Sequence, residues 1–128
     1  MGVSDREPTA DERTVTALSD EYEAALVGND LASIDAVFWD SPDLLRYGVA
    51  DMQTGFAAVV AWRAQAAPVS PTRQMLDRTV QELATGVVAV DITYRYADDT
   101  KLGRQSQTWV RRPEGWRIVR AHVSMIPA

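Results

Sequence analysis

The chain has 128 residues, of which 46% are hydrophobic and 24% are charged, and its formal net charge is −5. This length and composition predict one globular domain with a core of its own. The chain has no cysteine and one histidine, which excludes disulfides, thiolate nucleophiles and polyhistidine metal sites. The acidic balance argues against nucleic acids and anionic membranes as partners.

The first residues are expected to form a tail. Residues 1–12 are polar and carry no apolar segment like that of a signal peptide. No later apolar run approaches the roughly 20 residues that a membrane span needs. We therefore expect a flexible segment over 1–12, a single domain over 13–128, and a cytoplasmic protein without membrane contact.

The first half of the domain is predicted to be mainly helical. Gly28-Asn29 is typical of a helix end, and Asp30 is a suitable N-cap for a following helix, which Ser41-Pro42 would stop. The apolar residues recur at helical spacing in three segments, which we expect to be helices over about 11–28, 31–38 and 55–67.

The remainder is predicted to be β-structure. The stretch DLLRYG (43–48) is typical of a short strand, and a turn-like segment through 51–54 follows it. Short connections between the later strands indicate antiparallel hairpins. The fold class is therefore α+β, with three N-terminal helices packed on a curved antiparallel sheet, a cone that encloses a cavity. The four longer strands are expected over 73–84, 87–96, 102–112 and 115–126.

Two arginines occupy positions where core residues are expected. Arg46 lies inside the short strand, and Arg63 continues the apolar stripe of the third helix. Because a buried guanidinium must be paired, each could form a structural ion pair or lie over apolar surface. The two together favour an anion site, since the planar guanidinium binds a carboxylate through two hydrogen bonds. The acids considered as structural partners are Asp40, Asp43 and Asp51.

Several single polar residues are open to two interpretations. Tyr22, on the inner stripe of the first helix, is either a core or a pocket residue. Asp91 is the partner of an arginine or a base, and either Gln105 or Gln107 could face a polar ligand. His122 is interpreted as a core or interface residue unless it acts as a base. By period two it shares a face with Trp116, Ile118, Arg120 and Ser124.

Five motifs in order resemble one known family. They are YEAAL, GND, FWDSPDLLRYG, GRQSQTWVRR and PEGWRIVRAHVS. Together they look like the AtzH-like, oxalurate-catabolism family of the NTF2-like, SnoaL-like superfamily, over about residues 18–125. The resemblance implies an NTF2-like (cystatin-like) cone that forms a homodimer through the outer sheet face.

The resemblance also implies roles for particular residues. Tyr22 matches the family position of a proton donor, and Arg46 that of a carboxylate binder. Asp51, Ala66 and Arg120 depart from the family pattern, which has glutamate, arginine and a small residue there. The positions that match pocket or substrate-binding candidates are Trp39, Arg63, Arg104, Ser106, Gln107, His122 and Ser124.

The function implied for AtzH-type members is cofactor-free decarboxylation of an N-carboxylated, urea-type compound. Its ligand would be a small carboxylate or ureido compound, and neither a metal nor a cofactor is expected. One alternative is another lyase, dehydratase or isomerase of the superfamily, with Asp91 or His122 as base. A second alternative is a non-catalytic binding or scaffold protein for an amidase.

Overall fold

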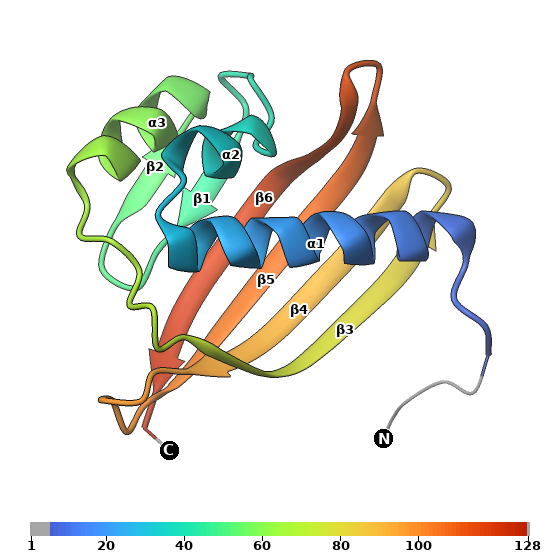
Figure 1. Cartoon of the computed structure of the whole chain (residues 1–128). Helices are drawn as coiled ribbons and strands as arrows, with labels where there is room; N and C mark the ends of the chain where they lie inside the picture. Colours follow the sequence, from blue (N-terminus) through green and yellow to red (C-terminus); the bar gives the residue numbers. More distant parts are fainter. Residues whose placement is uncertain (1–5, 128) are drawn as a thin grey trace.

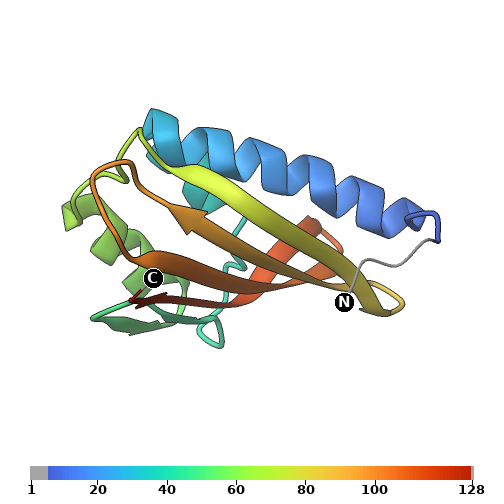
Figure 2. The same cartoon turned by 90° about the horizontal axis from the view of Figure 1, so that it is seen from below.

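The computed structural model of the chain describes residues 6–127. Three helices pack against one face of a curved six-stranded sheet, so the α+β prediction is confirmed (Figures 1 and 2). In chain order the elements are α1 (Ala10–Gly28), α2 (Leu31–Ala36), β1 (Leu45–Tyr47), β2 (Met52–Thr54), α3 (Phe56–Gln65), β3 (Gln74–Ala84), β4 (Val87–Arg95), β5 (Leu102–Arg112) and β6 (Gly115–Ile126).

The strand order in the sheet is β2-β1-β6-β5-β4-β3. The later strands form consecutive antiparallel hairpins, whereas β1 runs parallel to β6. Helix α1 crosses the inner face of the sheet, and α2 and α3 gather over the end that holds β1 and β2 (Figure 1). The largest fully buried side chains lie between these layers and include Val15, Leu44, Val59, Val88, Val90, Trp109 and Ile118.

Helix α1 begins inside the segment that was predicted as a flexible tail. Thr9 caps it, since the Thr9 hydroxyl accepts from the Glu12 amide while the Glu12 carboxylate accepts from the Thr9 amide. The Glu12 carboxylate also accepts from the Arg6 guanidinium and from the amide of Glu82 in β3. Residues 10–12 are thus helical, and the part of the prediction that concerns residues 1–5 lies outside the described residues.

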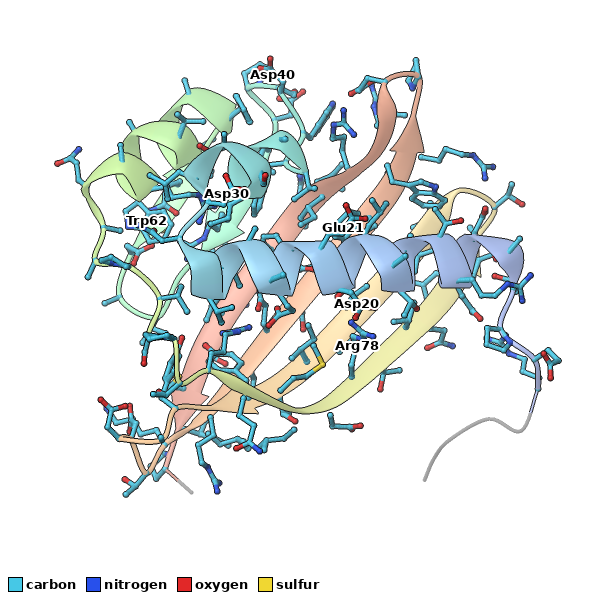
Figure 3. The ribbon with its side chains drawn as sticks, in the orientation of Figure 1. Asp20, Glu21, Asp30, Asp40, Trp62 and Arg78 are labelled. Carbon is cyan, nitrogen blue, oxygen red and sulfur yellow. The ribbon has the colours of Figure 1, made fainter. Side chains whose placement is uncertain are left out.

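The predicted helix boundaries near residue 30 are confirmed. Asn29 adopts a left-handed conformation (φ 53°), and its amide donates to the carbonyls of Ala25 and Leu26, which closes α1. The Asp30 carboxylate accepts from the Ser33 amide and so caps α2. Farther along the sheet, Arg78 of β3 contacts Asp20 of α1 at 2.7 Å and joins this helix to the sheet edge (Figure 3).

Strand β2 was predicted as a turn. Its three residues pair antiparallel with β1, and only the middle one, Gln53, is buried. A strand this short does not display the alternation by which longer strands are predicted. Its pairing matters for function because it holds the Gln53 side chain beside Arg46.

A bulge changes the faces of β6 part-way along the strand. Thr108 of β5 pairs with Arg120, but its neighbour Trp109 pairs with Ile118, which leaves Val119 as an extra residue. The expectation that Trp116 to Ser124 share one face by period two is therefore wrong. Before the bulge Trp116 and Ile118 face the core, and after it the inner face carries Ala121, Val123 and Met125.

None of the helices within residues 6–127 has the length and apolar character needed to cross a membrane.

Candidate active site

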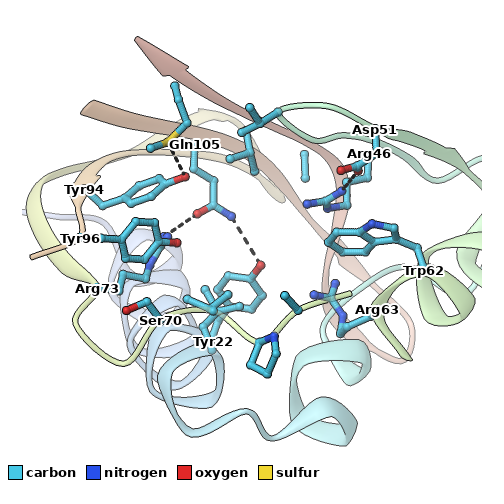
Figure 4. A pocket seen from close by; sticks show the side chains of 18 of the residues that line it. Tyr22, Arg46, Asp51, Trp62, Arg63, Ser70, Arg73, Tyr94, Tyr96 and Gln105 are labelled. Carbon is cyan, nitrogen blue, oxygen red and sulfur yellow. Dashed lines mark hydrogen bonds and ion pairs between the residues drawn. The ribbon is translucent and has the colours of Figure 1, made fainter. Parts of the chain in front are cut away.

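A pocket of about 400 Å³ lies between the inner face of the sheet and the helices (Figure 4). Tyr22, Gln105, Arg73 and two tyrosines stand at one end, while Arg46, Asp51, Trp62 and Arg63 stand at the other (Figure 4). Mainly apolar side chains line the pocket between these two ends. The lining is completed by Leu26, Phe38, Val49, Ala67, Pro68, Val69, Ser70, Ala121, Val123 and Met125.

Arg46 reaches the pocket from β1 and is firmly held there. Its Nη1 donates to Asp51 Oδ1 at 2.8 Å and to Gln53 Oε1 at 2.9 Å, and its guanidinium lies 3.8 Å from the centre of the Trp62 ring. Burial lowers the pKa of Arg46, while the hydrogen bond that Arg46 donates to the Asp51 carboxylate opposes that change. Within residues 6–127 its Nε and Nη2 atoms have no hydrogen-bond partner, so they are free to donate to a ligand.

Arg63 is buried at the same end of the pocket. Its Nε donates to Asp35 Oδ1 at 2.8 Å, and the residue is only 8% exposed. Its Nη2 is buried and has no hydrogen-bond partner within the described part of the chain. Because an unpaired buried donor costs about 1–3 kcal/mol, an acceptor from a ligand would be stabilising at this position. The guanidinium also lies beside the rings of Phe38 (5.3 Å) and Trp62 (5.4 Å).

The opposite end carries a chain of hydrogen bonds. Arg73 forms an ion pair with Glu23 through Nε (2.8 Å) and Nη2 (3.2 Å), and its Nη2 also donates to Gln105 Oε1 at 2.8 Å. Although burial lowers the pKa of Arg73, the pairing with Glu23 outweighs it and raises that pKa. Gln105 Nε2 in turn faces the Tyr22 hydroxyl at 3.5 Å. The chain thus begins and ends on adjacent residues of α1.

Aromatic side chains complete this end. The Arg73 guanidinium lies 3.8 Å from the centre of the Tyr94 ring, and Tyr96 packs edge-on against Tyr94. Burial raises the pKa of Tyr94. A glycine at position 103 makes room for the Tyr94 ring, since a Cβ atom there would overlap it.

The comparisons with known proteins agree on the family. The model of the AtzH-like family matches residues 7–128. This chain belongs to the AtzH-like family. A cystatin-like fold protein from Burkholderia xenovorans LB400 is 40% identical, with a TM-score of 0.88 over 91% of this chain and 92% of that one. No match is found among the curated proteins.

Two further solved structures extend this result. A protein of unknown function from the DUF3225 family, from Pectobacterium atrosepticum SCRI1043, is 36% identical with a TM-score of 0.87 over 92% of this chain and 93% of that one. An NTF2-like protein of unknown function from Pseudomonas putida KT2440 has a TM-score of 0.76 at 18% identity, over 93% and 89% of the two chains. The resemblance to AtzH-like, cystatin-like and NTF2-like proteins is therefore confirmed, and this AtzH-like chain has a pocket of small-molecule size.

Three of the predicted site residues meet in the pocket of this AtzH-like protein. Tyr22, Arg46 and Arg63 all line it. The alternative of structural ion pairs also holds in part, because Arg46 is paired with Asp51 and Arg63 with Asp35. Each arginine is therefore a pocket residue that already has one carboxylate partner.

Four predicted site residues lie instead on the outer face of the sheet. The Arg104 Nε donates to the Ser124 hydroxyl at 3.1 Å, and the Ser106 hydroxyl donates to Asp91 at 2.7 Å. His122 is exposed and packs edge-on against Tyr47. The bulge in β6 explains the errors for His122 and Ser124. Asp91 and His122, the bases considered for an isomerase, both point away from the pocket.

Two other predicted site residues, the half-buried Trp39 and the buried Gln107, are not part of the pocket lining. Trp39 packs near the Arg112 guanidinium (5.0 Å). Gln107 is buried, and its Oε1 accepts from the Trp109 indole at 3.0 Å. Arg120, which departs from the family pattern, is exposed and donates to the carbonyl of Asp43, away from the pocket.

Sequence reasoning missed several residues that line the pocket, namely Trp62, Arg73, Tyr94 and Tyr96. Gln105 was considered without being assigned to the site. The available signal was strand alternation, because Tyr94 and Tyr96 recur at period two and Gln105 shares a face with the buried Trp109. Within residues 6–127 no group of three or more histidine, aspartate or glutamate side chains is arranged to hold a metal ion.

Proposed function

We propose that this AtzH-like protein binds a small carboxylate in the pocket and releases CO₂ from an N-carboxylated, urea-type compound without a cofactor. The observation that carries the proposal is that, among the residues the structure describes, the buried Nη2 of Arg63 has no hydrogen-bond partner, and Nε and Nη2 of Arg46, which lines the same pocket, are unused. Two guanidinium groups with unused donors at one end of the pocket suit the two oxygens of a carboxylate.

The aspartates paired with these arginines suit a site that must release its bound carboxylate group as CO₂. A carboxylate that becomes CO₂ gives up its negative charge, so binding it too tightly would stabilise the ground state and slow the reaction. Asp51 and Asp35 each neutralise part of the positive charge at 2.8 Å. The apolar side chains of Phe38, Val123 and Met125 would favour the neutral product over the anion.

Tyr22 is the proposed proton donor. As the C–N bond breaks, its electron pair stays on nitrogen, which takes the proton of the Tyr22 hydroxyl, and an oxygen electron pair forms the second C=O bond of CO₂. The positive charge of Arg46 interacts with Tyr22 and stabilises the phenolate, which then recovers a proton from water. The net reaction consumes one proton and needs no electron acceptor.

The test is an assay of CO₂ release from N-carboxylated ureas. The Tyr22→Phe variant should lose about 10²–10⁴-fold in kcat, the usual worth of a general acid. Tyr47→Phe is the matched control, since Tyr47 is 45% exposed on the outer face, and its rate should equal that of wild type. A Tyr22→Phe rate within about twofold of wild type would refute Tyr22 as the donor.

A non-catalytic role is the second candidate. Its support is that both pocket arginines already have a carboxylate partner, which a purely structural ion pair would also require. In that case the protein would bind a ligand or dock on an amidase without turnover. Co-purification with an amidase, together with no CO₂ release from any N-carboxylated urea, would favour this candidate over the enzyme.

A further inference from the structure

At the polar end of the pocket, donors and acceptors follow one another in a fixed order from Arg73 through Gln105 to Tyr22. A guanidinium has five donors and no acceptor. The Arg73 side chain is 4% exposed and is held by Glu23 on one side and by the Tyr94 ring on another. Its Nη2 donates to Gln105 at 2.8 Å, so only the oxygen of the Gln105 amide can face Arg73.

The orientation of Gln105 then determines what Tyr22 offers. With Oε1 held by Arg73, the Nε2 of Gln105 faces the Tyr22 hydroxyl oxygen at 3.5 Å as a donor. The opposite amide orientation would bring its NH₂ group against the guanidinium, donor against donor. The Tyr22 oxygen therefore accepts, and its own hydrogen has no other hydrogen-bond partner within residues 6–127. That hydrogen is left for a ligand in the pocket.

We propose that Arg73 and Gln105 are specificity-determining residues that make the Tyr22 end of the pocket a donor. A ligand anchored by its carboxylate at Arg46 and Arg63 is then selected by its other end. The carbonyl of a neutral amide or ureido group accepts the Tyr22 hydrogen bond when the ligand binds, and in turnover the adjacent nitrogen takes the proton. An ammonium group is itself a donor and has no lone pair to accept the Tyr22 hydrogen, so amino acids are disfavoured.

This inference rests on the proposed carboxylate site, and matched ligands test it without turnover. Malonamate carries a carboxylate and a neutral amide, whereas β-alanine has the same length with an ammonium group. By isothermal titration calorimetry, wild type should bind malonamate at least about tenfold more tightly, the worth of one net hydrogen bond. Equal affinities would overturn the inference but leave the carboxylate site intact.

The Gln105→Glu variant should reverse the preference. The introduced carboxylate still accepts from Arg73, but it also accepts the Tyr22 hydrogen, so the pocket end becomes an acceptor with a negative charge. β-Alanine should then bind more tightly than malonamate. Gln81→Glu, the same substitution at an exposed position of β3, should keep the wild-type preference. A Gln105→Glu protein that still prefers malonamate would overturn the inference.

Two further outcomes separate the proposals. The Gln105→Met variant keeps the side-chain length but cannot hold the Tyr22 hydroxyl as an acceptor. Its affinities for malonamate and β-alanine should therefore agree to within about twofold. This variant also serves if Gln105→Glu does not fold, and an unchanged preference in it would count against the inference. If wild type binds neither malonamate nor β-alanine, the carboxylate site itself is wrong and both proposals fail.

Discussion

Arg46 and Arg63 use few of their nitrogens within the protein. Within residues 6–127, Arg46 donates through Nη1 alone and Arg63 through Nε alone. Arg73 differs, because Nε and Nη2 are both occupied by Glu23 and Gln105. At the scale of single residues, the first two arginines have the donors for a ligand, and the third is committed to the structure around Tyr22.

The Asp51 carboxylate competes with a ligand for Arg46. In an Asp51→Asn variant the side-chain oxygen can still accept from Nη1, but the negative charge is gone. Malonate should therefore bind about fivefold more tightly than to wild type, since a partly exposed ion pair is worth up to about 1 kcal/mol. Calorimetric titration measures the change.

Asp20→Asn is the control for this prediction. It removes the same charge from an ion pair with Arg78 at the far edge of the sheet, and it should leave malonate affinity unchanged (Figure 3). Weaker binding in Asp51→Asn would mean that the Asp51 charge orients Arg46 for the ligand and does not compete with it.

At the scale of elements, Glu12 joins the start of α1 to the end of β3. Glu12 is buried, with only 3% of the residue exposed. The pKa of the Glu12 carboxyl group is lowered to about 2. The largest cause is the hydrogen bond from the Arg6 guanidinium, and hydrogen bonds from the Glu82 and Thr9 amides add to it. A carboxyl group whose pKa is lower in the folded state stabilises the fold above its unfolded pKa, near 4.5.

The contribution of Glu12 to stability should be lost as the pH falls from about 4.5 towards about 2. The Glu12→Gln variant should be less stable than wild type at pH 7, and the difference in their free energies of unfolding should narrow as the pH falls through this window. Urea unfolding at a series of pH values measures the effect, with the exposed Glu21→Gln as control. A gap that stays constant from pH 7 to pH 2 would contradict the assignment.

How far the sequence predicts each element depends on its length and regularity. The long helix α1 and the hairpins of β3 to β6 were predicted within a few residues, because each repeats its pattern over several turns or pairs. Strand β2 was missed because three residues carry no period. The bulge at Val119 was missed because both faces of β6 carry apolar and polar residues, so a change of face leaves no clear trace in the sequence.

The same limits apply to the candidate site. Arg46 and Arg63 were predicted as site residues because a permanent cation among apolar residues is conspicuous. Tyr22 was predicted as a site residue because of the YEAAL motif. His122, Ser124, Arg104 and Ser106 were assigned to the pocket although they lie on the outer face. The bulge changes the face of β6 on which His122 and Ser124 lie, whereas for Arg104 and Ser106 alternation does not say which face of β5 looks inward. Both are properties of the folded sheet.

At the scale of the whole molecule, the cone positions residues from distant parts of the chain around one cavity. Helix α1 supplies Tyr22, β1 supplies Arg46, α3 supplies Arg63 and β5 supplies Gln105. The outer face of the same sheet carries exposed Met52 and Tyr47 beside His122. We propose this face as the surface of a homodimer, and light scattering of the purified protein would measure the mass of the assembly.

The most direct test of the account is a thermal unfolding series with increasing malonate. Wild type should gain about 2.7 kcal/mol of stability at a malonate concentration 100 times the Kd, which raises Tm by several degrees in a domain of this size. Arg46→Met should show no such rise, whereas Arg104→Met, which removes the same charge from the outer face, should respond like wild type. A rise in Arg46→Met equal to that of wild type, or no rise in wild type, would contradict a carboxylate site at Arg46.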